Sequence, residues 1–228
     1  MRPPVTASFI EPRPDLITPN PSGPADPLGE SVLDESRDWL RVFEPRDTRI
    51  VIGRGQDPER EVALDAARAD AIPIHRRVSG GGCVVLAPGM VVVSLRLPND
   101  RVGVDCWFAQ VNEALTPAIE RACGVRAVTR GHGDLAVGED GGERKVLGAS
   151  LRQTARWVYW LGALLVDDAV PLMERYLLSP SRRPAYRGDR GHRDFCTALG
   201  RYGATVAGLT ATVTDECRSR LEPRSSSR

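Results

Sequence analysis

Lysine is almost absent from this sequence of 228 residues: arginine supplies 30 of its 31 basic side chains, and Lys145 is the single lysine. A guanidinium is a wide, planar fork, whereas an ammonium is a compact charge on a thin stem that can enter a narrow site. A lysine that survives where arginine has taken the other basic positions indicates a place that a guanidinium does not fit. Lys145 is therefore the first candidate for a functional residue, and the alternative is that it escaped the bias toward arginine by chance.

Long hydrophobic runs are also lacking. No apolar run approaches the roughly 20 residues that a membrane-spanning helix needs, and the N-terminal MRPPVTASFIEPRPD has no continuous apolar core like that of a secretory signal. The formal net charge of +1 excludes a general attraction to nucleic acid or to an anionic membrane. We therefore expect a cytoplasmic protein with no membrane partner, in which the recognition of anions depends on local clusters.

The cysteines contain no CxxC pair, and none is spaced with histidine in a way that suggests a zinc site. The odd set consists of Cys83, Cys106, Cys123, Cys196 and Cys217. Reduced thiols are the simplest account of it.

Proline is concentrated at the N-terminus, where it makes up eight of the first 30 residues. Because proline lacks a backbone donor, residues 1–24 are expected to form an extended or disordered lead. Residues 25–221 are expected to form one domain with a basic segment at 179–195, and residues 222–228 a disordered tail. The remaining composition, 41% hydrophobic and 27% charged, is ordinary for a globular chain.

The hydrophobic period switches repeatedly between about two and 3.6 residues, which predicts an α+β domain on a mixed, largely antiparallel β-sheet flanked by helices. In the first half we expect a helix that begins at Asp26, a strand at 48–52, a helix at 57–72, a hairpin of CVVLA and MVVVSLRL around Pro88-Gly89, and a helix at 105–123 that Pro117 kinks or splits. In the second half we expect strands at 134–137, 145–153 and 157–166, and helices at 169–178 and 206–221.

The strongest local signal is the segment HRRVSGGGCVV, residues 75–85. Three successive glycines leave backbone N–H groups unshielded and permit φ values that aim several of them at one point, as phosphate oxygens require. The arginines before them offer forked donors for the same charge. The segment is neither a nucleotide P-loop, GxxxxGK[ST], nor a dinucleotide GxGxxG motif. A flexible turn between strands is the alternative interpretation.

This segment resembles the signature of the lipoate–protein ligase family. The resemblance extends upstream to IVIGRGQDP (50–58) and downstream to GDL (133–135), KVLGAS (145–150) and GALL (162–165), in the order of the family. It implies a biotin/lipoate ligase-like catalytic domain. It also implies that ATP and Mg²⁺ activate an acyl acid, such as lipoate or octanoate, to an acyl-adenylate, and that the acyl group passes to a lysine of a lipoyl-type acceptor domain.

The resemblance assigns roles position by position. Lys145 is implied to be catalytic and to contact both the acyl carboxylate and the α-phosphate, and Asp134 to lie near the adenylate and to help hold Mg²⁺. Arg54 and Gly148 are implied to lie, with Lys145, at the acyl site. The implied ATP-binding positions are Arg77, Gly80, Gly81, Gly82, Cys83, Val84, Val85 and Lys145. As alternatives, Arg77 is a surface charge, Asp134 a turn residue and Gly148 a bulge.

The sequence departs from the family pattern at several positions. Leu86-Ala87 replaces His-Asp, Gly133 replaces Asn, and Leu161 replaces His. Full-length ligases of the family also carry a C-terminal accessory domain, for which 228 residues leave no room. We therefore expect either a separate accessory polypeptide or a subgroup that works without one.

Two other functions remain open. The first is an ATP-independent octanoyl or lipoyl transferase that uses a cysteine thioester, with Cys83 as the nucleophile; the family pattern has alanine there, and no cysteine lies between Gly124 and Asp134. The second is a catalytically lapsed binding module that uses the basic segment for RNA. We favour acceptor docking or ATP-phosphate contact for that segment, and nucleic acid is not the expected partner. Its basic residues are Arg182, Arg183, Arg187, Arg190, His192 and Arg193.

Overall fold

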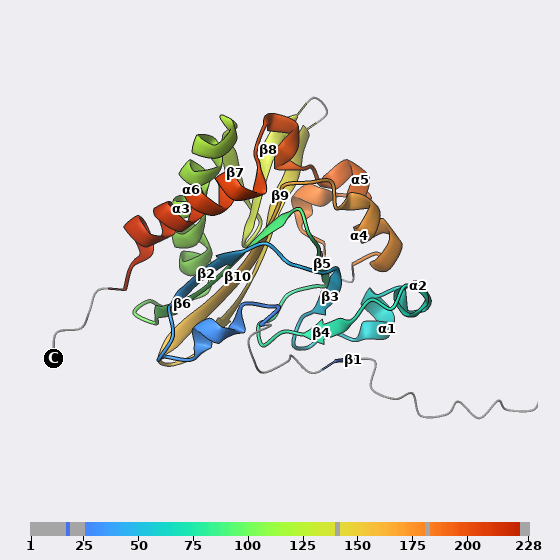
Figure 1. The fold of residues 1–228 in the computed structure, drawn as a ribbon, viewed down its shortest axis with the longest axis horizontal. Coiled ribbons are helices and arrows are strands. Elements are labelled where there is room, and N and C mark those ends of the chain that lie inside the picture. Colours follow the sequence, from blue (N-terminus) through green and yellow to red (C-terminus); the bar gives the residue numbers. More distant parts are fainter. Residues whose placement is uncertain (1–16, 19–25, 140–141, 181–182, 224–228) are drawn as a thin grey trace, which may run out of the picture.

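Two β-sheets form the frame of the molecule (Figure 1). The computed structural model describes residues 17–18, 26–139, 142–180 and 183–223. The larger sheet is antiparallel throughout, and its strands lie in the order β2 (Leu40–Phe43), β6 (Met90–Pro98), β10 (Trp157–Leu165), β9 (Gly142–Gln153), β8 (Asp134–Glu139) and β7 (Ala127–Arg130). The smaller sheet has the order β1 (Ile17–Thr18), β4 (Ile74–Arg76), β3 (Arg49–Ile52) and β5 (Val84–Leu86), with only the β3–β5 pair antiparallel. The predicted α+β class with a mixed, largely antiparallel sheet is confirmed, although the division into two sheets was not predicted.

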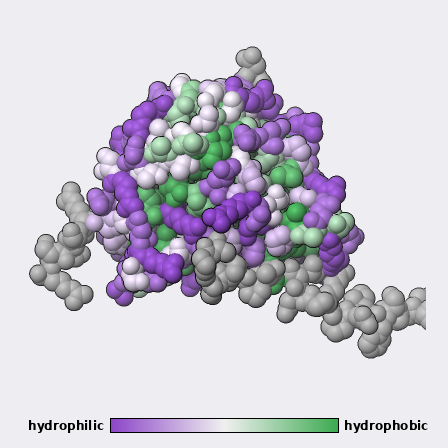
Figure 2. All heavy atoms as spheres, viewed as in Figure 1, coloured by the Kyte–Doolittle hydropathy of each residue, from purple (hydrophilic) through white to green (hydrophobic). Residues whose placement is uncertain are grey.

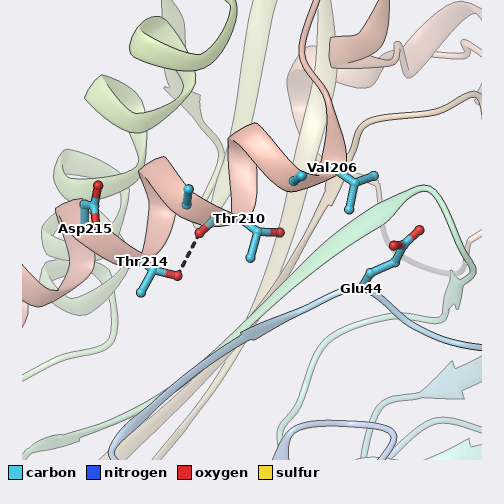
Figure 3. A pocket seen from close by; sticks show the side chains of 7 residues that line it. Glu44, Val206, Thr210, Thr214 and Asp215 are labelled. Carbon is cyan, nitrogen blue, oxygen red and sulfur yellow. Dashed lines mark hydrogen bonds between the residues drawn. The ribbon is translucent and has the colours of Figure 1, made fainter.

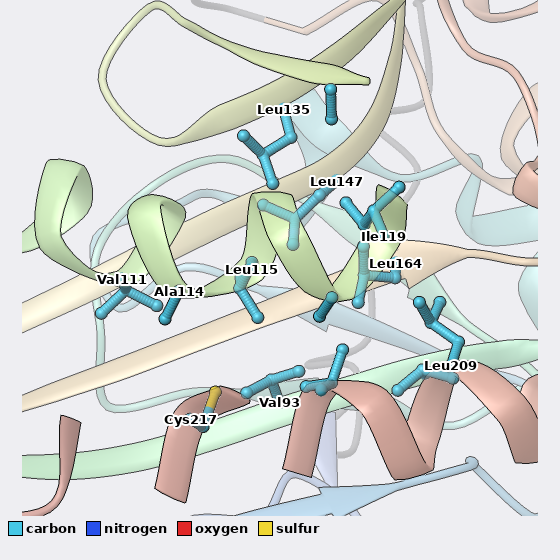
Figure 4. Packing of buried hydrophobic residues seen from close by; sticks show 14 of the residues in the cluster. Val93, Val111, Ala114, Leu115, Ile119, Leu135, Leu147, Leu164, Leu209 and Cys217 are labelled. Carbon is cyan, nitrogen blue, oxygen red and sulfur yellow. The ribbon is translucent and has the colours of Figure 1, made fainter. Parts of the chain in front are cut away.

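Two long helices, α3 (Asp105–Cys123) and α6 (Val206–Leu221), cover one face of the larger sheet (Figure 1). Both helices present apolar residues four positions apart, so that these lie on one side of the helix. Figure 4 shows Val111, Leu115 and Ile119 of α3 and Leu209 of α6 beside Val93 and other residues of the sheet; these five side chains are fully buried. Burying a side chain of this size stabilises the fold by about 1.5–3 kcal/mol.

The opposite face of the larger sheet packs against the smaller sheet. Residues of β6 and β10 alternate between the two faces, since Val92 and Tyr159 lie in a second apolar cluster that excludes their neighbours Val93 and Trp160. The same cluster contains Leu86 of the smaller sheet. The other helices are α1 (Pro58–Glu61), α2 (Leu64–Ala69), α4 (Val170–Tyr176) and α5 (His192–Phe195), with 3-10 turns η1 (Glu30–Leu33), η2 (Ala185–Arg187) and η3 (Leu199–Tyr202).

Most predicted elements of the second half of the chain are confirmed. The strands β8, β9 and β10 and the helices α4 and α6 lie where their hydrophobic periods predict them. The helix α3 also has its predicted bounds and continues through Pro117 without being split.

The predicted hairpin of CVVLA and MVVVSLRL is wrong. The strand β5 pairs with β3 in the smaller sheet, whereas β6 pairs with β2 and β10 in the larger one. The turn at Gly89 donates its N–H to Glu44 and accepts from the N–H groups of Val166 and Asp167. The Pro-Gly turn therefore passes the chain from one sheet to the other.

The predicted helix from Asp26 is wrong beyond its first turn. Only η1 is helical: Asp34 is extended, and the Arg37 N–H donates to its carbonyl in a turn that precedes β2. Asp26 accepts a hydrogen bond from the Ser31 N–H and forms an ion pair with Arg41, which is itself in β2. Pairing with β6 therefore overrides the helical spacing in this segment.

The predicted helix at 57–72 is interrupted. It is present as α1 and α2, because Val62 forms a bridge with Leu177 and the Ala63 N–H donates to the carbonyl of Tyr176.

Parts of the predicted lead and tail lie outside the described residues, namely 1–16, 19–24 and 224–228. Within the lead, Ile17–Thr18 forms a strand that pairs with β4. Among the residues that the structure describes, none of the helices has the length and apolar character to cross a bilayer. Figure 2 shows hydrophilic residues over most of the face in view, with hydrophobic ones gathered near its centre.

Candidate functional site

A β-bulge in β9 determines where Lys145 points. In the pairing of β8 with β9, Leu135 lies opposite Leu147 and Ala136 lies opposite Lys145, which leaves Val146 as an extra residue. Val146 and Leu147 are both buried in the cluster under α3 and α6. An extra residue in a strand turns the side chains before it to the other face. Lys145 is thereby aimed at the face that carries Gly148.

Asp134, the first residue of β8, is the partner of Lys145. The Lys145 Nζ lies 2.7 Å from Asp134 Oδ1, and the two side chains are only 25% and 14% exposed. The second carboxylate oxygen, Oδ2, accepts a hydrogen bond of 2.8 Å from the hydroxyl of Tyr186. The structure thus brings together two residues predicted from the sequence and adds Tyr186, which lies in the basic segment at 179–195.

Gly148 makes room for the lysine. A Cβ at this position would lie 2.8 Å from both Cε and Nζ of Lys145, which is closer than real side chains approach. The absence of a side chain therefore lets the Lys145 stem lie flat across β9.

The glycine loop, residues 79–83, is held by a buried arginine. The guanidinium of Arg77 donates to the carbonyl oxygens of Gly80 and Gly82, at 2.6 and 2.8 Å from Nη2, and Nη1 lies 3.4 Å from the Val51 carbonyl oxygen. Arg77 is 3% exposed, and burial lowers its pKa to about 10. The alternative of a surface charge is therefore wrong. Because it binds two carbonyls of the glycine loop, Arg77 holds the backbone of the loop in place.

The loop also lies against the strand that carries Lys145. The hydroxyls of Ser79 and Ser150 are 2.8 Å apart and buried, and Ser150 is on β9 two residues after Gly148. On the other side, a Cβ at Gly53 would lie 2.0 Å from the Gly81 carbonyl oxygen. The motifs around residues 53, 80 and 148 thus meet in space. Ser79 and Ser150 were inside the motifs, but the sequence alone did not single them out.

The remaining sequence-predicted residues differ in exposure. Gly80, Gly81 and Gly82 are exposed, as is Arg54, whose N–H donates to the carbonyl of Ser79. Val84 and Val85 belong to β5, and the Val85 side chain is fully buried among apolar residues. Val85 also pairs with Ile50 of β3 and presents no exposed atom to a ligand.

Cys83 packs against the same apolar cluster as Val85. Burial raises the pKa of its thiol to about 12, and the nearby guanidinium of Arg77 offsets only part of this rise. At neutral pH the side chain is therefore a thiol and not a thiolate, which is the nucleophilic form.

The basic segment lies next to the ion pair of Lys145 and Asp134. Phe195 is buried, and the guanidinium carbons of Arg187 and Arg190 lie 4.8 and 5.3 Å from the centre of its ring. A pocket of about 220 Å³ is lined here by Arg183, Arg187, Arg190 and His192, with other residues that include Glu174 and Asp189. Arg182 lies outside the described residues. The segment thus gathers cations around a small cavity.

A larger, open pocket of about 710 Å³ lies elsewhere, between Glu44 and α6 (Figure 3). Thr210, Thr214 and Asp215 line it, and none of the sequence-predicted site residues does. The candidate site is therefore assigned from the charged pair and the glycine loop, and not from the size of a cavity.

Comparisons with known proteins agree with these motifs. A family model described as the lipoyl protein ligase A/B catalytic domain matches residues 28–217. A putative lipoate-protein ligase A of Aeropyrum pernix is 32% identical over 166 residues, which cover 71% of this chain and 60% of that protein. The chain therefore spans less than two thirds of this relative's length.

Solved structures show the same fold. A bipartite lipoate protein ligase of Thermoplasma acidophilum, studied with its E2 lipoyl domain, superposes with a TM-score of 0.74 at 20% identity, over 91% of this chain and 82% of that one. A putative lipoate protein ligase of the same organism, with bound lipoic acid, gives 0.72 at 19% identity over 91% and 85%. A lipoate-protein ligase A bound with ATP gives 0.71 at 21% identity over 90% and 83%.

Proposed function

Since this chain belongs to the family of lipoyl protein ligase A/B catalytic domains, we propose that it uses ATP to activate lipoate, or a related acid such as octanoate, to an acyl-adenylate. The acyl group then passes to a lysine of a lipoyl-type acceptor domain. One observation carries this proposal. The bulge in β9 turns Lys145, the only lysine of the sequence, over Gly148 and places its ammonium 2.7 Å from Asp134. The glycine loop lies against the same strand.

The chemistry requires a positive charge at this point. In the first step, an oxygen of the acyl carboxylate bonds to the α-phosphorus of ATP while the bond from that phosphorus to the bridging oxygen breaks, and pyrophosphate leaves. In the second step, the amine of the acceptor lysine attacks the acyl carbonyl carbon, AMP leaves with the electrons of the bond that breaks, and the nitrogen that becomes the amide loses a proton to solvent. The ammonium of Lys145 stabilises the negative charge in both steps, which is electrostatic and not nucleophilic catalysis.

The phosphates are proposed to lie between the glycine loop and the basic segment. The exposed backbone at Gly80, Gly81 and Gly82 offers N–H groups, and Arg77 supports the loop by donating to the carbonyls of Gly80 and Gly82. Arg187, which lines the small pocket of the basic segment, offers a forked donor that suits phosphate oxygens. Direct contact between Arg77 and ATP stays a prediction from the family resemblance.

Mg²⁺ fits this site only as an ion that arrives with the nucleotide. Among the described residues, no group of three or more His, Cys, Asp or Glu side chains converges to hold a metal. Mg²⁺ at nucleotide sites is commonly held by one or two carboxylates together with phosphates and water, and it neutralises phosphate charge there. Asp134 is the carboxylate that would hold it.

The thioester alternative is disfavoured by the state of Cys83. A transferase of that type needs a thiolate, and burial holds the pKa of this thiol at about 12. The binding-module alternative is disfavoured by the intact pairing of Lys145 with Asp134, since a lapsed site has no need to hold an ammonium over a glycine. A salt-dependent affinity for RNA would favour that alternative.

An accessory polypeptide is part of the proposal. The Aeropyrum relative is longer than the matched region, and the Thermoplasma ligase is bipartite. We therefore propose that this chain works with a separate polypeptide that supplies an accessory domain, and that its acceptor is a lipoyl domain.

The test is acylation of a panel of apo-lipoyl domains with lipoate, ATP and Mg²⁺, with and without an accessory domain taken from a relative. Intact mass reports the transfer, and ATP–pyrophosphate exchange reports the activation step. Lys145→Arg is expected to reduce both by about a hundredfold or more, because the wider guanidinium does not fit over Gly148. Cys83→Ala, which introduces the family's alanine, is expected to remain active.

Two results would overturn the proposal. The first is undiminished acylation by Lys145→Arg. The second is transfer from an acyl carrier protein that needs Cys83 and no ATP, which would establish the transferase instead.

A further inference from the structure

The contact between Tyr186 and Asp134 joins two parts of the site that are distant in the sequence. Asp134 begins β8, whereas Tyr186 lies in η2, within the basic segment. The Tyr186 hydroxyl donates to Asp134 Oδ2 at 2.8 Å, while Oδ1 faces the Lys145 Nζ at 2.7 Å. Each carboxylate oxygen therefore has its own partner.

The ring of Tyr186 is fixed from behind. Its centroid lies 5.0 Å from that of Phe195, which is buried in α5. The guanidinium of Arg190 donates to the Tyr186 carbonyl at 2.6 Å and to the Glu143 carbonyl of β9 at 2.8 Å. The packing of the ring and the hydrogen bonds to the backbone therefore fix the position of the hydroxyl at Asp134.

The hydroxyl is the donor in this contact, because a carboxylate oxygen accepts.

From this geometry we infer that Tyr186 is a positioning residue, which holds the Asp134 carboxylate so that only Oδ1 faces Lys145. An ammonium has three N–H donors. With one of them on Oδ1, two remain for the acyl carboxylate and the α-phosphate. Without the hydroxyl, the carboxylate is free to turn and to accept from Lys145 with both oxygens, which leaves one donor for the substrates. This inference rests on the proposed function.

The variant Tyr186→Phe keeps the ring against Phe195 and removes only the hydroxyl. We expect it to lower kcat of ATP–pyrophosphate exchange by roughly tenfold, as for the loss of a hydrogen bond to a charged group, with the KM values for ATP and lipoate nearly unchanged. Tyr202→Phe is the matched control, since the Tyr202 hydroxyl donates to Glu139 at the other end of β8. It is expected to leave kcat unchanged.

A double-mutant cycle tests whether Tyr186 acts through Asp134. In an Asp134→Asn background, the further change Tyr186→Phe is expected to lower kcat much less than it does in the wild type, because the carboxylate on which it acts is gone. Equal effects of Tyr186→Phe in both backgrounds would overturn the inference. An effect of Tyr186→Phe on KM with no effect on kcat would also overturn it.

A readout without turnover separates this inference from the proposed function. Because the chain has one lysine, labelling with ¹⁵N-lysine gives a single side-chain ammonium signal. Tyr186→Phe is expected to shift this signal and Tyr202→Phe to leave it in place. An unshifted signal in Tyr186→Phe would sink the inference even if the enzyme proved to be a ligase. A shifted signal in a protein without exchange activity would sink the proposed function and leave the contact established.

Discussion

At the scale of single residues, the site depends on what is absent at position 148 as much as on the charge at position 145. The Lys145 stem occupies the space where a side chain at position 148 would begin. Sequence reasoning selected Lys145, Asp134 and Gly148 because they share two short motifs. It did not select Tyr186 as their partner. The contact depends on how residues 183–195 pack beside β8 and β9, and local sequence patterns do not predict contacts between such distant segments.

The substitution Gly148→Ala tests this dependence. The new Cβ would meet the far end of a flexible side chain, so that Lys145 is displaced while the strand is retained. We expect the proposed ligase activity to fall by about tenfold to a hundredfold, as for a misplaced catalytic group, with little change in Tm. The comparison is Gly138→Ala on β8, where a Cβ meets no atom within 4 Å. Equal activity of the two variants would contradict this account of Gly148.

At the scale of elements, pairing partners decided where the sequence-based prediction failed. Inner strands such as β6 and β10, which pair on both sides and are buried, can be predicted from their continuous apolar runs. The segment at 40–43 and the turn at Pro88-Gly89 do not, because their conformation is set by pairing with β6 and by contacts with Asp167. Local spacing carries no information on such distant partners.

Contacts between short helices at the edge of the smaller sheet are expected to depend on pH. Asp70, at the end of α2, accepts from Arg175 Nη2 at 2.9 Å and from the Tyr176 hydroxyl at 2.8 Å, both on α4. Hydrogen bonds from Arg175 and then from Tyr176 lower the pKa of Asp70 to about 2. Because the folded state holds this carboxyl at a lower pKa than the unfolded chain does, its contribution to stability is present above about pH 4 and is lost as the pH falls toward 2.

The measurement is the Tm of the wild type and of Asp70→Asn between pH 7 and pH 2.5. We expect the variant to be slightly less stable at neutral pH, because the pair is exposed, and the difference to shrink below pH 4. A difference that stays constant down to pH 2.5 would show that the charge of Asp70 has no part in joining α2 to α4.

At the scale of the whole molecule, the larger sheet contributes to two apolar clusters. One cluster joins it to α3 and α6, and the other joins it to the smaller sheet. A defect on the helix side therefore weakens the strand that carries Lys145. We expect the chain to unfold as one cooperative unit.

The variant Leu115→Ala makes such a defect, since Leu115 is fully buried in α3. We expect it to lower the free energy of unfolding by about 3 kcal/mol. The midpoints of urea unfolding should stay coincident by circular dichroism and tryptophan fluorescence. Leu178→Ala, at a leucine that is 41% exposed, serves as the comparison and should change the stability little. Separate midpoints for the two signals would contradict a single unit.

The scarcity of lysine has a consequence for the proposed formation of an acyl-adenylate. An acyl-adenylate acylates amines that it meets, and a guanidinium is no such target because it remains protonated. Lys145 is three-quarters buried and bonded to Asp134, and the chain has no other lysine. Under the proposed function, an acyl-adenylate that leaves the site therefore meets few amines on the chain that formed it, and its acyl group passes to the acceptor or to water.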